Sequence, residues 1–188
     1  MRATENGNVN VLLVEDEDPL RDLAGLILRK NPFVGPNGVT EKRDGVEALR
    51  AIEEDPEAFD LVISDVRMPT MNGSELARRI LNMRTNVRVF LMSSGIDPSD
   101  GPILSSILPD DRLIGMITKP FGRIHLDQAV EVAAGRQLNG IPLETTRKEV
   151  GRRTIEACHH FKLDLPARYQ QLVHELAEEL RRDRDRMS

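Results

Sequence analysis

The chain has 188 residues, of which 39% are hydrophobic and 30% charged, a composition typical of a globular protein with one full core and part of a second unit. Its formal net charge of −5, with five Phe, one Tyr and no Trp, argues against a protein that binds nucleic acid through a basic surface or stacked aromatic rings. A single cysteine excludes an internal disulfide, and the lack of a signal peptide or of an apolar run near ~18 residues predicts a cytoplasmic protein without a membrane segment.

The first predicted element is a β-branched strand over residues 9–14, which ends in a run of acidic side chains. Asp18 followed by Pro19 is typical of a helix N-cap and first turn, and apolar residues at helical spacing continue this helix to about residue 28. Prolines and glycines between residues 32 and 38 end it. A weaker strand is predicted around residues 39–41.

The same alternation continues along the chain. Helices are predicted over residues 44–54, 74–83, 97–108 and 124–137, and strands over residues 61–63, 87–92 and 114–118. Five strands that alternate with five helices predict an α/β fold, in which a parallel sheet carries helices on both faces. The strands are almost continuously apolar, as expected for a sheet buried on both sides.

The pattern changes near the carboxyl end of the chain. Residues 138–142 are predicted to be a linker, and residues 143–188 a helical hairpin built from helices over 143–161 and 166–187. Two helices bury little apolar surface by themselves. We therefore expect this extension to pack on the first domain or on a second copy of itself.

Polar side chains stand where four of the predicted strands end. Glu15 and Asp16 follow the first strand, Asp65 the third, Ser93 the fourth and Lys119 the fifth. The carboxyl ends of parallel strands meet at one edge of the sheet, which is where such folds bind ligands. These five side chains are therefore predicted to converge.

Three carboxylates in one place repel each other. At a separation of ~4–6 Å each pair costs up to ~4 kcal/mol at an effective dielectric constant near 20, and Lys119 supplies one compensating charge. The remaining negative charge predicts a hard divalent cation such as Mg²⁺. A carboxylate beside Mg²⁺ and a lysine is a suitable nucleophile toward a phosphoryl group, to which Ser93 would donate a hydrogen bond.

These residues lie in motifs that resemble the receiver domain of two-component response regulators, of the chemotaxis-regulator kind. The resemblance covers residues 8–137. It is carried by Val-Leu-Leu-Val-Glu-Asp-Glu at 11–17, Leu-Val-Ile-Ser-Asp-Val-Arg-Met-Pro-Thr-Met-Asn-Gly at 61–73, Phe-Leu-Met-Ser-Ser-Gly at 90–95 and Thr-Lys-Pro-Phe at 118–121. It implies a flavodoxin-like, five-stranded parallel sheet of order 2-1-3-4-5.

The resemblance also implies roles for individual residues. Asp65 would accept a phosphoryl group from a histidine kinase or a histidine phosphotransfer protein, so the chain would be a phosphoacceptor and not an enzyme. Mg²⁺ would be held by Asp16, Asp65 and the backbone carbonyl of Arg67, with Glu15 acting through water. Ser93 and Lys119 would contact the phosphoryl group, and the Lys119–Pro120 bond would be cis.

Two departures from the family pattern bear on the switch. Met116 stands where the family has an aromatic residue, so the predicted switch residues are Ser93 and Met116, with methionine repacking in place of a swinging ring. The interval between Ser93 and Lys119 is longer than the family pattern. The fourth helix, around residues 97–108, is therefore expected to be displaced or shortened.

The output of the switch is open to more than one interpretation. We expect contact with a downstream protein, or a homodimer formed through residues 143–188. DNA binding by the C-terminal helices is an alternative, although this segment carries ten basic and nine acidic residues and no compact three-helix pattern. A phosphatase of the haloacid dehalogenase type is less consistent, because Arg67 stands where a second aspartate is needed.

Overall fold

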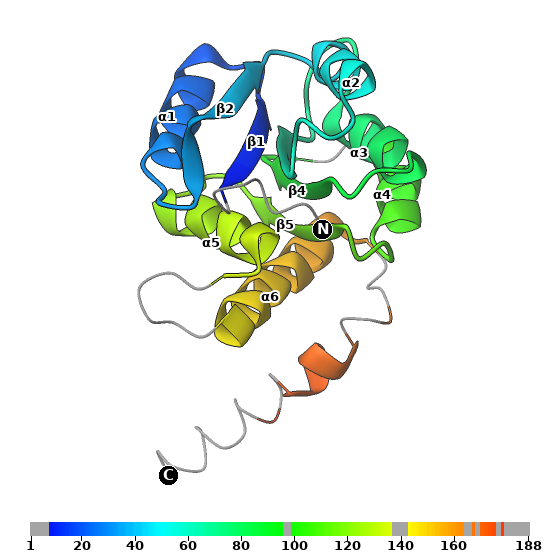
Figure 1. Cartoon of the computed structure of the whole chain (residues 1–188). Coiled ribbons are helices and arrows are strands. Elements are labelled where there is room, and N and C mark those ends of the chain that lie inside the picture. Colours follow the sequence, from blue (N-terminus) through cyan, green and yellow to red (C-terminus); the bar gives the residue numbers. More distant parts are fainter. Residues whose placement is uncertain are drawn as a thin grey trace.

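The computed structural model describes residues 8–95, 99–136 and 143–163, together with residues 167, 170–175 and 178. Strands and helices alternate as far as residue 134, and a further helix follows (Figure 1). The strands are β1 Val9–Val14, β2 Val34–Lys42, β3 Leu61–Asp65, β4 Arg88–Ser93 and β5 Leu113–Thr118, and the helices are α1 Asp18–Arg29, α2 Gly45–Glu54, α3 Gly73–Asn82, α4 Asp100–Ile107, α5 Arg123–Ala134 and α6 Leu143–Phe161.

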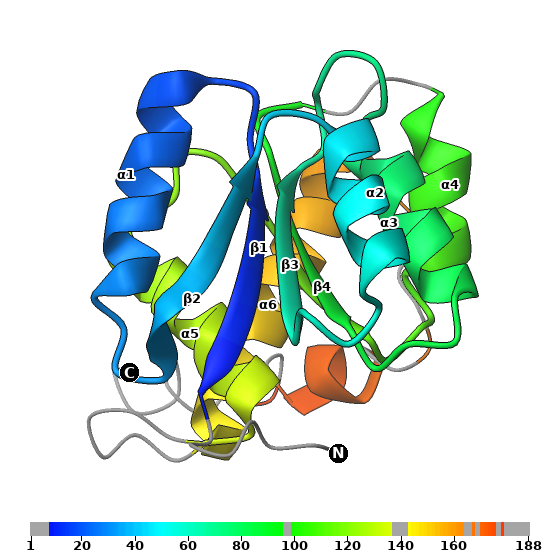
Figure 2. The same cartoon turned by 45° about the horizontal axis from the view of Figure 1, so that its top comes forward.

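The five strands form one parallel sheet in the order β2-β1-β3-β4-β5. Helices α1 and α5 cover one face, and α2, α3 and α4 cover the other (Figure 2). Each face has its own apolar core: one core joins the sheet to α2, α3 and α4, and the other joins it to α1 and α5. The predicted fold class and strand order are confirmed, and the two cores hold the strand ends at one edge of the sheet.

Local capping determines where two of these helices begin. The Asp44 side chain accepts hydrogen bonds from the backbone N–H groups of Val46 and Glu47, at 2.7 and 2.9 Å, at the start of α2. The Asn72 side chain accepts one from the N–H of Glu75, at 3.0 Å, at the start of α3. Such caps satisfy backbone donors that the first helical turn leaves unpaired.

The predicted cap of α1 is wrong by one residue. Glu17 is the N-cap and its side chain makes no capping hydrogen bond, while Asp18 is the first helical residue. The Asp18 carboxylate pairs with Arg21 and lies 3.6 Å from the Arg43 guanidinium. The carboxylate is thus used in ion pairs instead of on the helix terminus.

Strand β2 is longer than the predicted strand over residues 39–41. It begins at Val34, which pairs with Val9, and its register shifts before Val39, which pairs with Val11. The glycines and proline at residues 35, 36 and 38 lie within this irregular stretch. Glycine and proline are typical of turns, so the sequence predicts a turn at these residues. In the structure they form a bulge within the strand.

Helix α4 has eight residues, fewer than the 10 to 12 of α1, α2, α3 and α5, as the long interval predicted. It begins later than predicted, and residues 97–98 lie outside the described part of the chain. Its first residue, Asp100, is buried and ties α4 to α3. One carboxylate oxygen of Asp100 accepts hydrogen bonds from the Asn72 amide, at 2.7 Å, and from the Ser74 hydroxyl, at 2.6 Å.

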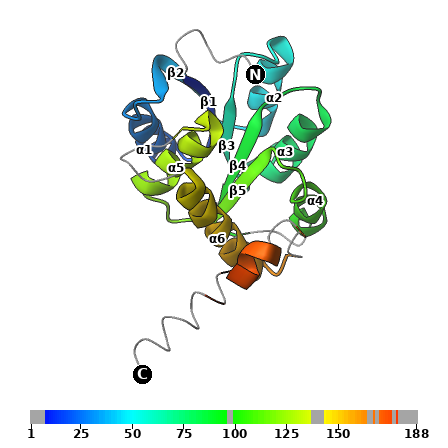
Figure 3. The same ribbon diagram turned by 60° about the horizontal axis from the view of Figure 1, so that its bottom comes forward.

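Helix α6 has the bounds that the sequence predicts and packs along β5, the edge strand of the sheet (Figure 3). The linker predicted over residues 138–142 lies outside the described residues, and residues 170–175 of the second predicted C-terminal helix are helical. Among the helices that the structure describes, none is both long enough and apolar enough to span a bilayer.

Candidate functional site

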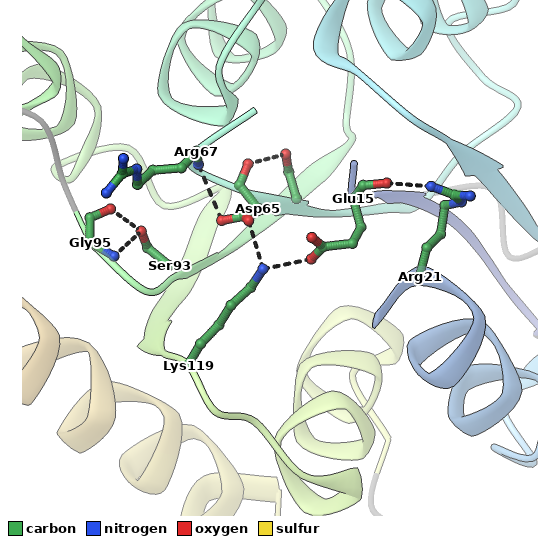
Figure 4. A network of polar contacts seen from close by, with 8 residues as sticks. Glu15, Arg21, Asp65, Arg67, Ser93, Gly95 and Lys119 are labelled. Carbon is green, nitrogen blue, oxygen red and sulfur yellow. Dashed lines mark hydrogen bonds and ion pairs between the residues drawn. The ribbon is translucent and has the colours of Figure 1, made fainter. Parts of the chain in front are cut away.

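Three strand ends, those of β1, β3 and β5, bring charged side chains together at the carboxyl edge of the sheet. Carboxylate oxygens of Glu15, Asp16 and Asp65 all lie within 4.8 Å of one another. The ammonium group of Lys119 lies between two of them, 2.6 Å from Oδ2 of Asp65 and 2.8 Å from Oε2 of Glu15 (Figure 4). The structure thus places these four side chains in one cluster, named the acidic pocket below, in the arrangement that the strand ends predict.

This pocket is largely removed from solvent. Glu15 and Asp65 are 0% and 3% exposed, and Asp16 is half-buried. Arg21, which is itself buried, donates a hydrogen bond of 2.8 Å to the backbone carbonyl of Glu15 and so holds the end of β1 in place. Sequence reasoning missed Arg21, because one arginine on a helix gives no sign of which loop it reaches.

Burial and neighbouring charges shift two pKa values in the pocket. Desolvation raises the pKa of Glu15, and the nearby Asp65 carboxylate raises it further, against the opposing effect of Lys119. Burial alone would lower the pKa of Lys119, but its hydrogen bonds to Asp65 and Glu15 outweigh that effect and raise it. Lys119 therefore stays an ammonium group, and the pocket favours an added positive charge.

Both carboxylate oxygens of Asp65 have defined partners. Oδ1 accepts a hydrogen bond from the backbone N–H of Arg67, at 3.1 Å, and Oδ2 accepts one from Lys119. The loop after Asp65 returns close to the strand, since a Cβ atom at Gly73 would lie 2.0 Å from the carbonyl oxygen of Asp65. Glycine is thus required at position 73 for the loop to close behind the aspartate.

Ser93 stands at the same edge, but its hydroxyl group faces its own loop. It donates a hydrogen bond to the carbonyl of Gly95 and accepts one from the N–H of Gly95, at 3.1 Å. Next to it, the backbone N–H of Lys119 donates to the carbonyl of Ser93, at 2.7 Å, and the Lys119–Pro120 bond is cis, as the family resemblance implied. The Ser93 hydroxyl is therefore hydrogen-bonded to Gly95 and not to Asp65.

Comparison with known proteins agrees with this geometry. Residues 11–131 match the response regulator receiver domain. The chain belongs to the response regulator receiver family. Relatives include the sensor kinase CckA of Brucella abortus, 32% identical over 137 residues, which covers 72% of this chain and 14% of that protein. Another is the alkaline phosphatase synthesis transcriptional regulatory protein SphR of Synechococcus elongatus, 32% identical over 142 residues, covering 72% of this chain and 52% of that protein.

A solved receiver structure shows the same fold. The signal receiver domain of the putative response regulator NarL from Mycobacterium tuberculosis has a TM-score of 0.54 and 23% sequence identity, covering 69% of this chain and 98% of that one. The receiver fold is therefore shared. The chain spans only part of the curated relatives named above, since it matches 14% and 52% of their lengths.

The acidic pocket of this receiver fits a divalent metal ion. Oε1 of Glu15 is buried and lacks a hydrogen-bond partner within the described residues, and the two other carboxylates lie beside it. A buried oxygen without a donor is costly unless a cation or an ordered water satisfies it. Because all three groups offer hard oxygen ligands, this donor set suits Mg²⁺.

The receiver's second predicted switch residue, Met116, is fully buried in the core that carries α2, α3 and α4. Its backbone N–H donates a hydrogen bond of 3.0 Å to the hydroxyl of Thr154, on α6. Sequence reasoning missed Thr154, because a threonine among the charged residues of a helix carries no signal that it reaches a sheet edge.

Proposed function

We propose that this receiver accepts a phosphoryl group on Asp65, in the cytoplasm, from a phosphohistidine of a histidine kinase or a histidine phosphotransfer protein, and that it signals by protein contact. One observation carries the proposal. The Asp65 carboxylate is paired with the partly buried ammonium group of Lys119, and carboxylate oxygens of Glu15, Asp16 and Asp65 lie within 4.8 Å of one another.

The chemistry is a transfer between two nucleophiles. A carboxylate oxygen of Asp65 attacks phosphorus, an O–P bond forms, and the P–N bond to the imidazole of the donor breaks. The electron pair of that bond returns to the imidazole nitrogen. Lys119, held at 2.6 Å from Asp65, neutralises charge on the phosphoryl oxygens as the transfer proceeds.

Four groups would hold the metal. They are the carboxylates of Asp16 and Asp65, the backbone carbonyl of Arg67, and Glu15 through water. When bound, Mg²⁺ supplies positive charge to the phosphoryl oxygens. The carboxylate of Glu15 also keeps Lys119 on the Asp65 side of the pocket, through its 2.8 Å contact with the ammonium group.

Ser93 changes partners in this proposal. In the unmodified chain its hydroxyl bonds to the backbone of Gly95. A phosphoryl group on Asp65 offers strong acceptor oxygens, so the Ser93 hydroxyl would exchange the Gly95 carbonyl for one of them. Ser93 is then the first group outside the pocket to respond to modification.

The two other functions considered lack a specific supporting observation. For DNA binding by the C-terminal helices, no basic surface is singled out within the described residues, and α6 packs part of its surface against β5. A phosphatase of the haloacid dehalogenase type would need an acid at position 67, where the structure has an exposed arginine.

Phosphorylation can be tested directly with a small phosphodonor. Full-length protein incubated with acetyl phosphate and Mg²⁺ should gain one phosphoryl group by mass spectrometry, and Asp65→Asn should gain none. Glu17→Gln is a matched control, because Glu17 is an exposed acid next to the pocket. An unmodified wild type, or equal labelling of Asp65→Asn, would overturn the proposal. Sustained turnover of a phosphomonoester would support a phosphatase instead.

A further inference from the structure

Helix α6 covers the outer edge of β5, with α5 along one flank and α4 beyond the other (Figure 3). A side chain of α6 packs closely on the backbone of β5 at Gly115, where a Cβ atom would lie 2.6 Å from Cγ1 of Val150. Toward its carboxyl end α6 contributes Ala157 and Cys158 to the core beneath α4. The helix is thus seated on the sheet along most of its length.

Polar groups supply much of this contact. The Thr154 hydroxyl accepts the hydrogen bond from Met116, and the Thr146 hydroxyl donates one of 2.8 Å to Glu131 on α5. Both threonines are buried, at 0% and 1% exposed. Arg153 also donates to Gln128 of α5. Groups of this kind bond water when they are exposed, so burying them contributes only a small net free energy and allows reversible docking.

Two chains of contacts run from Asp65 to α6. The first passes through β5: Lys119, directly after this strand, bonds both to Asp65 and to Ser93, and Met116, within the strand, bonds to Thr154.

The second passes through the loop after Asp65. Gly73 packs against the carbonyl of Asp65, and its neighbours Asn72 and Ser74 hold Asp100 at the start of α4. A Cβ atom at Gly101, the next residue of α4, would lie 3.9 Å from Leu163, just beyond α6. Two routes of contact therefore connect Asp65 with α6 and with the residues that directly follow it.

We propose that α6 is a reversible cover of the β5 edge, seated in the unmodified chain and loosened when Asp65 carries a phosphoryl group. The inference rests on the proposed function. As Lys119 and Ser93 turn toward the phosphoryl oxygens, β5 moves relative to α6, and the bond between Met116 and Thr154 lengthens. The phosphoryl group on Asp65 then stabilises the open form of α6 relative to the closed form, which is the condition for shifting their populations.

Hydrogen exchange on the full-length protein tests this inference, with beryllofluoride and Mg²⁺ as the phosphoryl mimic. Fluorine NMR first shows whether the mimic saturates one site in the wild type and not in Asp65→Asn. Mass spectrometry then follows amide exchange in α6 with and without the mimic. We expect amides of α6 to exchange at least about five-fold faster when the site is filled, the lower end of typical coupling between sites.

Variants at two threonines of α6 distinguish coupling to the site of Asp65 from a general loosening of the helix. Thr154→Val and Thr146→Val each delete one buried hydroxyl of α6 and keep the side-chain shape, but only Thr154 bonds to β5. Each should speed exchange in the unmodified protein. The response to beryllofluoride should shrink in Thr154→Val and persist in Thr146→Val, and Thr154→Ser, which keeps the hydroxyl, should respond like the wild type.

The outcomes are distinct. A site that does not saturate overturns the proposed function, and this inference with it. A saturated site with unchanged exchange in α6 overturns the inference alone. A full response in Thr154→Val would show that the bond to Met116 does not couple α6 to the pocket, which also overturns it.

Discussion

Lys119 allows Glu15 and Asp65 to lie side by side out of solvent, because it donates a hydrogen bond to each carboxylate. The convergence of these groups could be predicted, since each follows an apolar strand and parallel strands end at one edge. The orientation of the Ser93 hydroxyl toward Gly95 could not, because a side-chain rotamer depends on contacts that appear only in the folded chain.

Removing one acid from the pocket should stabilise the metal-free protein. Asp16→Asn relieves repulsion among three carboxylates, and we expect a gain of about 1 kcal/mol in the free energy of unfolding without Mg²⁺. The stabilisation that Mg²⁺ gives the wild type should be largely lost in the variant. Urea unfolding with and without Mg²⁺ measures both effects.

Glu17→Gln is the control for this charge change, because Glu17 is exposed at the adjacent position. It should leave the response to Mg²⁺ unchanged. An Asp16→Asn variant that is still stabilised by Mg²⁺ as much as the wild type would contradict metal binding in this pocket.

A methyl group at position 73 should be costly. In Gly73→Ala the new Cβ atom would meet the carbonyl oxygen of Asp65 at 2.0 Å, so the loop or the end of β3 must move. We expect a loss of about 2 to 3 kcal/mol in stability, read from the urea midpoint. Gly122→Ala is the matched control, since nothing lies within 4 Å of its Cβ position. Equal midpoints for the two variants would refute the tight packing at Gly73.

At the scale of elements, the sequence predicted strands well where its pattern fits only a strand. Strands β3, β4 and β5 are short apolar runs between breakers, and the sequence places them within two residues. Strand β2 was predicted too short, because the register shift between Val34 and Val39 carries turn-like residues. The N-cap of α1 was wrong because Asp18 pairs with Arg21, three residues along the same helix, and capping rules do not include such an ion pair.

The buried carboxylate of Asp100 should be important for anchoring α4. Asp100→Ala removes the acceptor of the Asn72 amide and the Ser74 hydroxyl, and leaves both donors without this partner. We expect a loss of about 2 kcal/mol in stability and faster amide exchange in α4. Ser99→Ala, at the preceding N-cap, makes a suitable control because Ser99 forms no capping hydrogen bond. Similar losses of stability in both variants would show that the hydrogen bonds of Asp100 to Asn72 and Ser74 do not anchor α4.

The stabilising contribution of Glu75, in the first turn of α3, should be lost at acid pH. Hydrogen bonds from Arg78 and Arg79 lower the pKa of Glu75 to about 2. A carboxyl group whose pKa is lower in the folded state stabilises fully above its ordinary value near 4.5, and this contribution is lost as the pH falls from 4.5 toward 2. Because both arginines are partly exposed, we expect a loss below about 1 kcal/mol.

Glu75→Gln measures this contribution. Its urea midpoint should lie below that of the wild type at pH 7, and the difference should narrow between pH 4.5 and 2. If the difference in urea midpoint between the two proteins stays constant over this pH range, the ion pairs of Glu75 are not its cause.

At the scale of the whole molecule, the sequence left open whether the C-terminal extension packs on the first domain or on a second copy. The structure places α6 on β5 of its own chain. The apolar stripe of a helix shows that one face of the helix is buried, but not against which surface. The sequence alone therefore could not decide between the first domain and a second copy. The division at residues 138–142 and a homodimer through residues 143–188 stay predictions.

Removing the C-terminal segment should destabilise the receiver. A chain ending at Arg136 would expose the surfaces that Val150, Ile155 and Ala157 cover, all of which are buried. From the apolar area concerned we expect a loss of at least about 3 kcal/mol, measured by urea unfolding. A truncated chain as stable as the full one would mean that α6 contributes no net free energy to the fold.

The position of β5 at the border of the sheet has one more consequence. A strand with bare backbone groups along one side is a template on which a strand of another molecule can assemble. Helix α6 occupies the position along β5 at which a strand of another molecule would pair. If signalling lifts it, each activated molecule would briefly offer a growth point for intermolecular sheets, and we expect slow, concentration-dependent aggregation to accompany prolonged activation.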